Sequence, residues 1–376
     1  MNRRQALGLF AGFVAGSPLW AQDEGVLGPV NVHEFEEAAK RKLHKLAYDF
    51  IAGGVEDELT LRANRQAFER YFLVPRVMTD VSTVDTSIEL FGVQMETPII
   101  IAPTGGKSLV FPDAELTVAK AALNAKVVCT SGGGGPEKVI ADGQPLVWWS
   151  NTIGQKDRES AQGYARRMED NGARAITITV DNQYQSNRDR NNRNRFDYGY
   201  MREGVPGDAE RRKPVNPALP AMWQPHTPNL TWQYLDWLRG ATKVPLIVKG
   251  ILAPEDARLA VENGADGIIV SNHGGRQLDG AIASLDALPD IVDAVGGKAP
   301  VLMDGGIRRG SDILKALALG ARAVLVGRAP LWGLGAFGQA GVERVMWMLG
   351  AELKLSLALA GQPGLRTVNR SLVRRL

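Results

Sequence analysis

The sequence predicts an α/β fold, an eight-stranded (β/α)8 barrel, from two alternating patterns. Eight short and nearly continuous apolar runs follow one another, and helical patterns separate most of them. Such runs are typical of parallel strands that are covered on both faces, and eight strand–helix units favour closure into a barrel. The apolar runs are residues 98–102, 127–130, 146–149, 175–180, 246–249, 267–271, 301–303 and 323–326. The helical patterns between them are residues 114–124, 159–171, 254–263, 285–295 and 311–319.

A doubly wound open sheet is the alternative architecture. That fold usually carries a Gly-x-Gly-x-x-Gly loop after its first strand, where the glycines let the backbone approach a dinucleotide. The first apolar run is followed instead by Pro-Thr-Gly-Gly-Lys at residues 103–107. The barrel is therefore the favoured interpretation.

The composition fits one large domain and excludes some functions. The chain has 376 residues, of which 44% are hydrophobic, and its 42 glycines suit many tight loops between strands and helices. The net charge is only +3 and the basic residues are dispersed, so nucleic-acid binding is not indicated. Cys129 is the only cysteine, which excludes an internal disulfide.

Residues 1–22 are predicted to be a twin-arginine export signal that precedes a barrel domain at residues 23–376. Arg3 and Arg4 come before a short apolar stretch and then small or turn residues, which is the export pattern. The apolar stretch is too short to cross a bilayer as a helix. A periplasmic protein is expected, with a cytoplasmic one as the alternative.

The segments outside the barrel include helices and one long connection. Helical spacing predicts a helix over residues 31–52, a second over 56–68 and a third over 342–360, whereas Pro75 predicts irregular structure over 71–77. The connection from about 182 to 245 is polar and carries several arginines. A connection this long in a compact domain is usually a functional lid or disordered.

The strongest chemical pattern is Ser-Asn-His-Gly-Gly-Arg-Gln-Leu-Asp-Gly at residues 271–280, directly after an apolar run. His273 can accept a proton near neutral pH. Arg276 can bind a carboxylate through two parallel hydrogen bonds. A base beside a carboxylate-binding cation predicts the removal of a proton from a small acid.

Glycine and arginine also follow the last two predicted strands. In barrels of this kind phosphate binds after strands seven and eight, to backbone N–H groups and cationic side chains. The seventh strand is followed by Asp304, Gly305, Gly306, Ile307 and Arg308 and the eighth by Gly327 and Arg328. These two loops predict a phosphate-binding site.

The 271–280 segment resembles the signature of the FMN-dependent 2-hydroxy acid oxidases and dehydrogenases, such as glycolate oxidase and lactate and mandelate dehydrogenases. The resemblance covers nearly the whole chain after residue 30. It implies FMN as cofactor and a small 2-hydroxy acid as substrate. It also implies that His273 is the catalytic base, that Asp181 pairs with it, and that Arg276 and Arg188 bind the substrate carboxylate. The connection after residue 181 covers the active site in that family.

The resemblance further implies a set of flavin contacts. Lys249 is expected near N1 and the C2 oxygen of the flavin, where a cation stabilises the reduced ring. For Cys129 a small buried side chain is an equally good interpretation. The remaining expected contacts at the strand ends are Pro103, Thr104, Gly105, Asn151, Thr179 and Ser271.

Several positions depart from that family's pattern. Phe50 stands where the family has a tyrosine that contacts the substrate carboxylate, and Ile153 stands near the position of a second tyrosine. Ser131 and the glycines after it replace a tryptophan, and Asn151 replaces a glutamine. We therefore expect a bulkier or different substrate than glycolate or lactate.

Two alternative functions remain open from the sequence. One is a related flavoenzyme that oxidises an amine or a peptide-derived group, and the other is a flavin-binding protein without hydroxy acid turnover. The electron acceptor is expected to be oxygen or a separate carrier. No Cys-x-x-Cys-His haem-attachment motif is present, so any onward electron carrier has to be a separate molecule. The resemblance allows a homo-oligomer, although no residue pattern indicates one.

Overall fold

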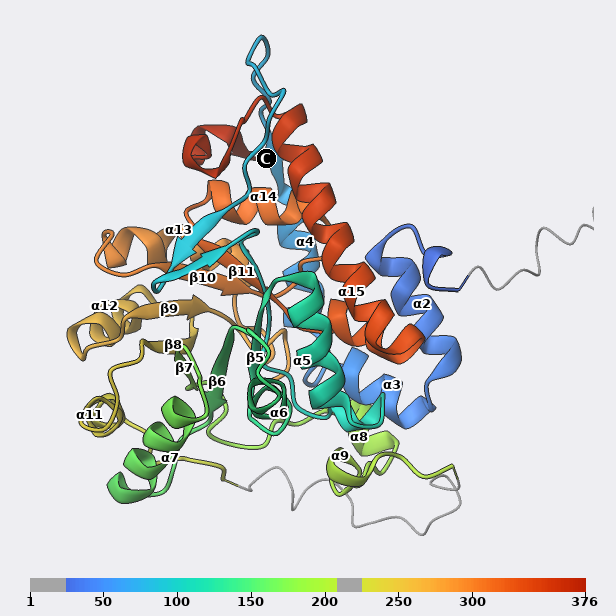
Figure 1. Cartoon of the computed structure of the whole chain (residues 1–376), viewed down its shortest axis with the longest axis vertical. Helices are drawn as coiled ribbons and strands as arrows, with labels where there is room; N and C mark the ends of the chain where they lie inside the picture. Colours follow the sequence, from blue (N-terminus) through green and yellow to red (C-terminus); the bar gives the residue numbers. More distant parts are fainter. Residues whose placement is uncertain (1–24, 208–224) are drawn as a thin grey trace, which may run out of the picture.

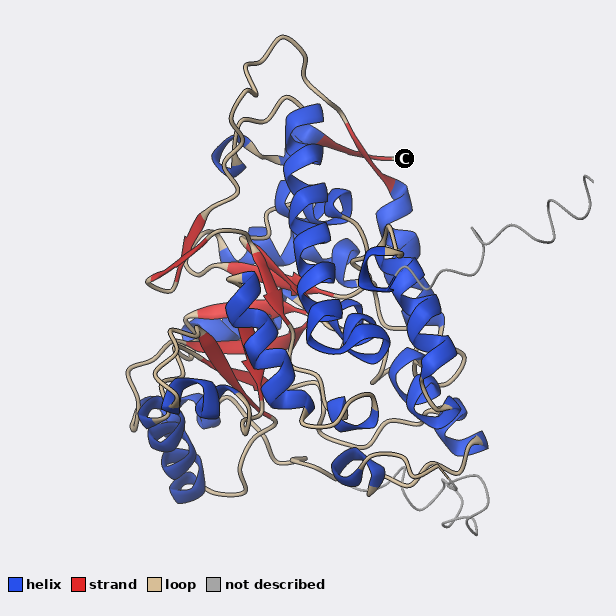
Figure 2. Ribbon diagram, turned by 45° about the vertical axis from the view of Figure 1, so that its right-hand side comes forward, coloured by secondary structure: helices blue, strands red, loops and turns tan. Residues whose placement is uncertain are grey.

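The computed structural model describes residues 25–207 and 225–376, and its centre is a closed barrel of eight parallel strands (Figures 1 and 2). Strands β4 to β11 pair in chain order, and β11 pairs with β4 to close the barrel. The predicted barrel is confirmed, and each predicted apolar run overlaps one strand, although β5, β6, β8 and β10 extend beyond their runs. The strands are β4 (Ile99–Ile101), β5 (Val128–Ser131), β6 (Trp148–Thr152), β7 (Ile176–Thr179), β8 (Leu246–Ile251), β9 (Gly267–Val270), β10 (Val301–Asp304) and β11 (Ala323–Val326).

The barrel interior is filled by side chains and is not a pore. Alternate residues of the strands point inward, where Ile100, Trp149, Ile247 and Leu302 belong to one buried apolar cluster. A hairpin of β2 (Ile88–Leu90) and β3 (Val93–Met95) contributes to the same cluster. Because this interior is packed, a ligand has to bind at an end of the barrel.

Helices cover the outside of the barrel, as the alternating pattern predicts (Figure 2). Their apolar faces pack against the outward side chains of the strands in a second, larger buried cluster. The helix α6 was not predicted. The helices are α5 (Ala114–Ala125), α6 (Pro136–Ala141), α7 (Arg158–Asp170), α11 (Gln233–Arg239), α12 (Pro254–Glu262), α13 (Ser284–Val295) and α14 (Gly310–Ala318).

The predicted helix over residues 31–52 is wrong as a single element, because the chain forms α2 (Val32–Lys42) and α3 (Lys45–Ala52). Leu43 ends α2 in an extended conformation, and the His44 ring accepts a hydrogen bond from the Leu46 backbone N–H to begin α3. The apolar periodicity continues across this break, so periodicity alone could not reveal it. The next helix, α4 (Leu59–Arg70), confirms the prediction for 56–68 with shifted ends.

Residues 71–77 are not wholly irregular, because β1 (Tyr71–Leu73) pairs with β12 (Val373–Arg375). The C-terminal helical prediction is confirmed as the second half of α15 (Arg328–Leu359), which lies against α2 and α5 (Figure 1). Non-helical backbone at Phe337 and Gly338 divides α15. No helix in the described ranges has the length and apolar character needed to cross a membrane.

The long connection between β7 and β8 is partly ordered into short helices. Its described parts contain α8 (Asp189–Arg193), α9 (Tyr200–Glu203) and α11, and a bridge joins Tyr184 to Pro225. Residues 208–224 lie outside the described part, as does the predicted export signal at 1–22.

Candidate active site

A cavity of about 590 Å³ lies at the carboxyl ends of the barrel strands. Barrel enzymes place their catalytic groups at this end, and the volume is within the range of cofactor sites. The predicted site residues line this cavity, apart from Asp181, Cys129 and Ser271. Those that line it are His273, Arg276, Arg188, Pro103, Thr104, Gly105, Asn151, Thr179, Lys249, Asp304, Gly305, Gly306, Ile307, Arg308, Gly327 and Arg328.

His273 and Asp181 form a hydrogen-bonded pair at the ends of β9 and β7. The distance from His273 Nδ1 to Asp181 Oδ1 is 2.8 Å. His273 has a left-handed backbone conformation with φ of 57°, which residues other than glycine rarely adopt. Gly275 continues this turn, and a Cβ there would lie 2.6 Å from the Leu61 backbone. Gly275 therefore lets this loop pack closely against the backbone of α4.

The surroundings keep His273 neutral and Asp181 ionised. Burial lowers the pKa of His273, and Asp181 offsets only part of that effect. For Asp181 burial acts to raise the pKa, but His273, through its hydrogen bond, and the charge of Lys249 hold it below its ordinary value. With the Asp181 carboxylate at Nδ1, Nε2 is the ring nitrogen left to accept a proton. The pair has the arrangement of a general base with an orienting carboxylate.

Lys249 belongs to a second buried network, which it forms with Ser271 and Asp304. Its Nζ donates to Ser271 Oγ at 3.0 Å and lies 3.3 Å from Asp304 Oδ2, and Ser271 Oγ donates to Asp304 Oδ1 at 2.6 Å. Burial acts to lower the pKa of Lys249, but Asp304 and Asp181 raise it above its ordinary value. The buried Lys249 ammonium is therefore paired. The prediction that Lys249 ends its strand is wrong, since β8 continues to Ile251.

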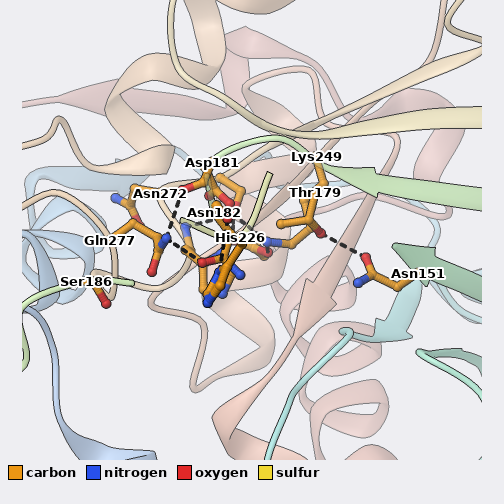
Figure 3. A network of polar contacts seen from close by, with 12 residues as sticks. Asn151, Thr179, Asp181, Asn182, Ser186, His226, Lys249, Asn272 and Gln277 are labelled. Atoms are coloured by element: carbon orange, nitrogen blue, oxygen red, sulfur yellow. Dashed lines mark hydrogen bonds and ion pairs between the residues drawn. The ribbon is translucent and has the colours of Figure 1, made fainter. Parts of the chain in front are cut away.

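Ser271 does not line the cavity, but it helps to position His273, because its Oγ also accepts a hydrogen bond from the His273 backbone N–H at 3.0 Å. Figure 3 shows the adjoining contacts. Thr179 Oγ1 donates to Asn151 Oδ1 at 2.9 Å, and Gln277 Nε2 donates to the Asp181 carbonyl and to Asn182. These bonds fix the side chains at the ends of β6 and β7.

Arg276 and Arg328 bind the carboxyl end of α3, which the sequence did not suggest. Arg276 Nη1 donates to the carbonyls of Phe50, Ile51 and Gly53 at 2.7 to 3.2 Å. Arg328 donates to the carbonyls of Ile51, Gly53 and Gly274 at 2.9 to 3.0 Å. The last carbonyls of a helix lack partners within the helix, so cations are favourable there. The guanidinium groups are therefore held in place before any ligand binds.

Neither guanidinium group forms an ion pair with a carboxylate in the described part of the chain, which makes the cavity suited to anions. Burial, followed by the charges of Arg188 and Arg328, holds the pKa of Arg276 well below its usual range. Burial and the charge of Arg308 lower the pKa of Arg328 to about 9. A bound anion would remove this repulsion. The arginines and the glycine loops after β10 and β11 therefore fit a phosphate, as expected for FMN.

The opposite wall carries the departures from the expected pattern. Phe50 and Ile153 line the cavity, and neither has a hydroxyl group. Ser131 does not line the cavity itself, and its Oγ donates to Glu115 Oε2 at 2.9 Å. Glu115 lines the cavity and is neutralised by the buried Lys107 at 2.9 Å. Sequence reasoning missed this ion pair, because the two residues lie in a loop and a helix without any motif.

The prediction that Cys129 contacts the flavin is not supported by its position. The thiol is buried in the cluster between the barrel and its helices, away from the cavity lining. Burial raises its pKa to about 12, so it stays protonated. Five residues that were not predicted line the cavity from the described part of the connection after β7, namely Asn182, Gln185, Tyr198, Met201 and His226. This part of the connection therefore borders the cavity.

Comparisons with known proteins give one consistent result. The family described as FMN-dependent dehydrogenase matches residues 39–375. A peroxisomal (S)-2-hydroxy-acid oxidase of Oryza sativa subsp. japonica is 42% identical over 348 residues, which covers 91% of this chain and 95% of that protein. An L-lactate oxidase of Nostoc sp. is 42% identical over 358 residues, which covers 92% of this chain and 98% of that protein. A crystal structure of mandelate oxidase superposes with a TM-score of 0.82 at 39% identity, covering 93% and 98%.

Proposed function

Because this chain belongs to the FMN-dependent dehydrogenase family, we propose that its cavity oxidises a 2-hydroxy acid to the 2-oxo acid. The FMN dependence and the hydroxy acid chemistry follow from relatives that match more than nine-tenths of the chain. The single observation that supports this reaction most is that a neutral, carboxylate-oriented histidine shares a cavity with unneutralised arginines. That arrangement holds an acid and takes a proton from it.

In this proposal His273 accepts a proton from the bound substrate at Nε2, and Asp181 stabilises the imidazolium that results. Bound FMN supplies the acceptor for the two electrons. Lys249, buried beside the cavity and held by Ser271 and Asp304, supplies a fixed positive charge for the electron-rich side of the site.

Arg276 and Arg188 are proposed to bind the substrate carboxylate. All three Arg276 hydrogen bonds within the described residues come from Nη1, so Nε and Nη2 remain for an anion. The Cζ atoms of Arg276 and Arg188 lie 5.1 and 5.6 Å from the centre of the Phe50 ring. Both cations therefore face one small volume beside that ring.

Arg308, Arg328 and the backbone of Gly305, Gly306 and Gly327 are proposed to hold the FMN phosphate. They lie at the ends of β10 and β11, where barrel enzymes bind phosphate. The remaining volume favours a substrate larger than glycolate, because Phe50, Ile153 and Gly132 leave that wall without the larger hydroxyl-bearing and indole side chains of the family pattern.

The test is to mix the purified holoenzyme anaerobically with glycolate, L-lactate and L-mandelate and to follow the absorbance of oxidised flavin. We expect rapid bleaching, with L-mandelate or L-lactate more effective than glycolate. Bound FMN that none of the acids reduces would contradict the proposal and favour the amine or peptide-derived alternative. A protein that binds no FMN would contradict the cofactor site itself.

We also propose molecular oxygen as the electron acceptor, since the relatives named above are oxidases. Hydrogen peroxide should form in proportion to the 2-oxo acid in air. Its absence, with turnover restored by an artificial electron acceptor, would indicate a separate carrier.

Export through residues 1–22 is a further proposal, supported by the Arg3-Arg4 pair before a short apolar stretch. A reporter fused to these residues should reach the periplasm. Replacing both arginines with lysine should keep it in the cytoplasm, and unchanged export of that variant would contradict the twin-arginine route.

A further inference from the structure

Tyr198 brings a phenol into the arginine end of the cavity, from the connection after β7. It lines the cavity together with Phe50, Arg188 and Arg276, and its ring stays 36% exposed. The ring packs edge-on against Phe50, with centroids 6.4 Å apart, and against Phe196 at 5.5 Å. Aromatic contacts on two sides therefore hold the ring at the wall where the family pattern has lost its tyrosine at position 50.

The hydrogen bonds of the Tyr198 hydroxyl group show whether its proton already has an acceptor. Its oxygen accepts a bond from Gln185 Nε2 at 2.7 Å and a longer one from Asn191 Nδ2 at 3.4 Å. A phenol has one proton to donate besides its acceptor lone pairs. The oxygen is used as an acceptor from two amides, and no acceptor for its proton is found among the described residues. The O–H is therefore left for a ligand.

The charges around Tyr198 indicate which ligand this is. The guanidinium groups of Arg188 and Arg276 both lie over the ring of Phe50, against which Tyr198 packs. Burial lowers the pKa of both arginines, and the phenol acts in the opposite direction on each. Two cations and one free O–H donor thus converge beside one ring, and a carboxylate can accept from all three.

We propose that Tyr198 donates a hydrogen bond to the substrate carboxylate and takes over the hydroxyl contact that Phe50 cannot make. This inference rests on the proposed function, because it requires a 2-hydroxy acid beside Arg276. It makes Tyr198 a substrate-binding residue with no part in proton removal, since the His273–Asp181 pair is complete without it.

The test compares wild-type holoenzyme with Tyr198→Phe in anaerobic stopped-flow reduction by L-lactate and L-mandelate and by the corresponding amides. We expect the apparent Kd for either acid to rise about ten- to a hundredfold, as for a lost hydrogen bond to a charged group. The limiting reduction rate should change less than about threefold, since the base is intact. For the amides the Kd should change less than about threefold, because the negative charge is gone.

Two variants make the test specific. Tyr200→Phe removes a phenol from a buried neighbour that does not line the cavity, and it should leave the Kd for the acids unchanged. Adding Phe50→Tyr to Tyr198→Phe should restore affinity for the acids, because a hydroxyl returns beside the same arginines. Rescue would support carboxylate binding against a purely structural role for Tyr198.

Equal Kd values for the acids in wild type and Tyr198→Phe would overturn the inference. An equal loss of affinity for the acids and the amides would also overturn it, as would a loss of bound FMN, since either result would indicate a structural role for Tyr198. Failure of the proposed function is distinct, because wild-type enzyme itself would then remain oxidised with every acid.

Discussion

The two walls of the cavity are built differently. On the wall formed by the ends of β7 to β10, His273, Asp181, Lys249, Ser271 and Asp304 hold one another through hydrogen bonds and ion pairs. On the wall formed by α3 and the ends of β5 and β6, the lining includes Phe50, Ile153 and Gly132, whose side chains carry no polar group. The first wall positions charged groups and a proton acceptor, and the second wall defines the shape of the space for the substrate. Proton transfer and substrate selection are therefore carried by different residues and can vary separately.

The barrel explains why only one wall is fixed so tightly. The residues of the polar wall sit at the ends of adjacent paired strands, so the sheet sets their spacing. A Cβ at Gly250 would lie 2.8 Å from Asp181 Cβ, so β8 can approach Asp181 this closely only at a glycine. On the other wall Phe50 comes from a helix end outside the barrel sheet. Gly132 and Ile153 directly follow β5 and β6, but neither has a polar side chain that could join the network of the polar wall.

The largest effect should come from His273→Asn, which removes the base of the polar wall. Flavin reduction by the substrate should slow about 10³-fold while FMN stays bound. His226→Asn is a matched control. His226 also lines the cavity, but among the described residues its Nδ1 contacts the Asn182 backbone carbonyl, at 3.3 Å, and no carboxylate. The control variant should slow flavin reduction less than about tenfold. Comparable losses in both variants would refute a special role for His273.

A smaller loss is expected from Asp181→Asn, which keeps the shape but removes the charge beside His273. Reduction should slow about 10²-fold, because the imidazolium is no longer stabilised. The anaerobic reduction rate at saturating substrate is the measurement. A rate within threefold of wild type would show that the carboxylate only positions the ring.

The pH profile tests the same pair without the loss of any side chain. Burial lowers the pKa of His273 below its ordinary value of 6.5, and the base works only when neutral. The profile of kcat/KM, which reports the free enzyme, should therefore fall on the acid side with a midpoint below 6.5. Asp181→Asn should move this midpoint lower still, because Asp181 raises that pKa. A midpoint above 6.5 would contradict the assigned electrostatics.

The smallest effect is expected on the apolar wall, from Phe50→Tyr alone. A hydroxyl beside Arg276 should lower KM for a small acid such as glycolate about three- to tenfold, with little change in kcat. Steady-state kinetics, with a thermal melt to check folding, would measure it. An unchanged KM would show that position 50 does not face the carboxylate.

The sequence predicted the barrel and the polar wall well, because both follow from local patterns. Apolar runs mark the strands, and the residue after a strand end, such as His273 or Asp181, must lie at the active-site end of a barrel. Tyr198 and Glu115 could not be predicted this way. Their positions depend on how a long connection folds back and on a lysine that pairs across a turn, and neither leaves a repeating pattern. Arg276 and Arg328 were recognised as cations, but their bonds to the end of α3 required the three-dimensional structure.

The most direct test of the division between the two walls is anaerobic single-turnover reduction by one 2-hydroxy acid over a range of concentrations. Wild type, Asp181→Asn and Phe50→Tyr should be compared for limiting rate and apparent Kd. We predict that Asp181→Asn lowers the limiting rate with a nearly unchanged Kd, whereas Phe50→Tyr changes the Kd with a nearly unchanged limiting rate. If both variants altered both quantities to the same degree, chemistry and recognition would not be separable in this cavity.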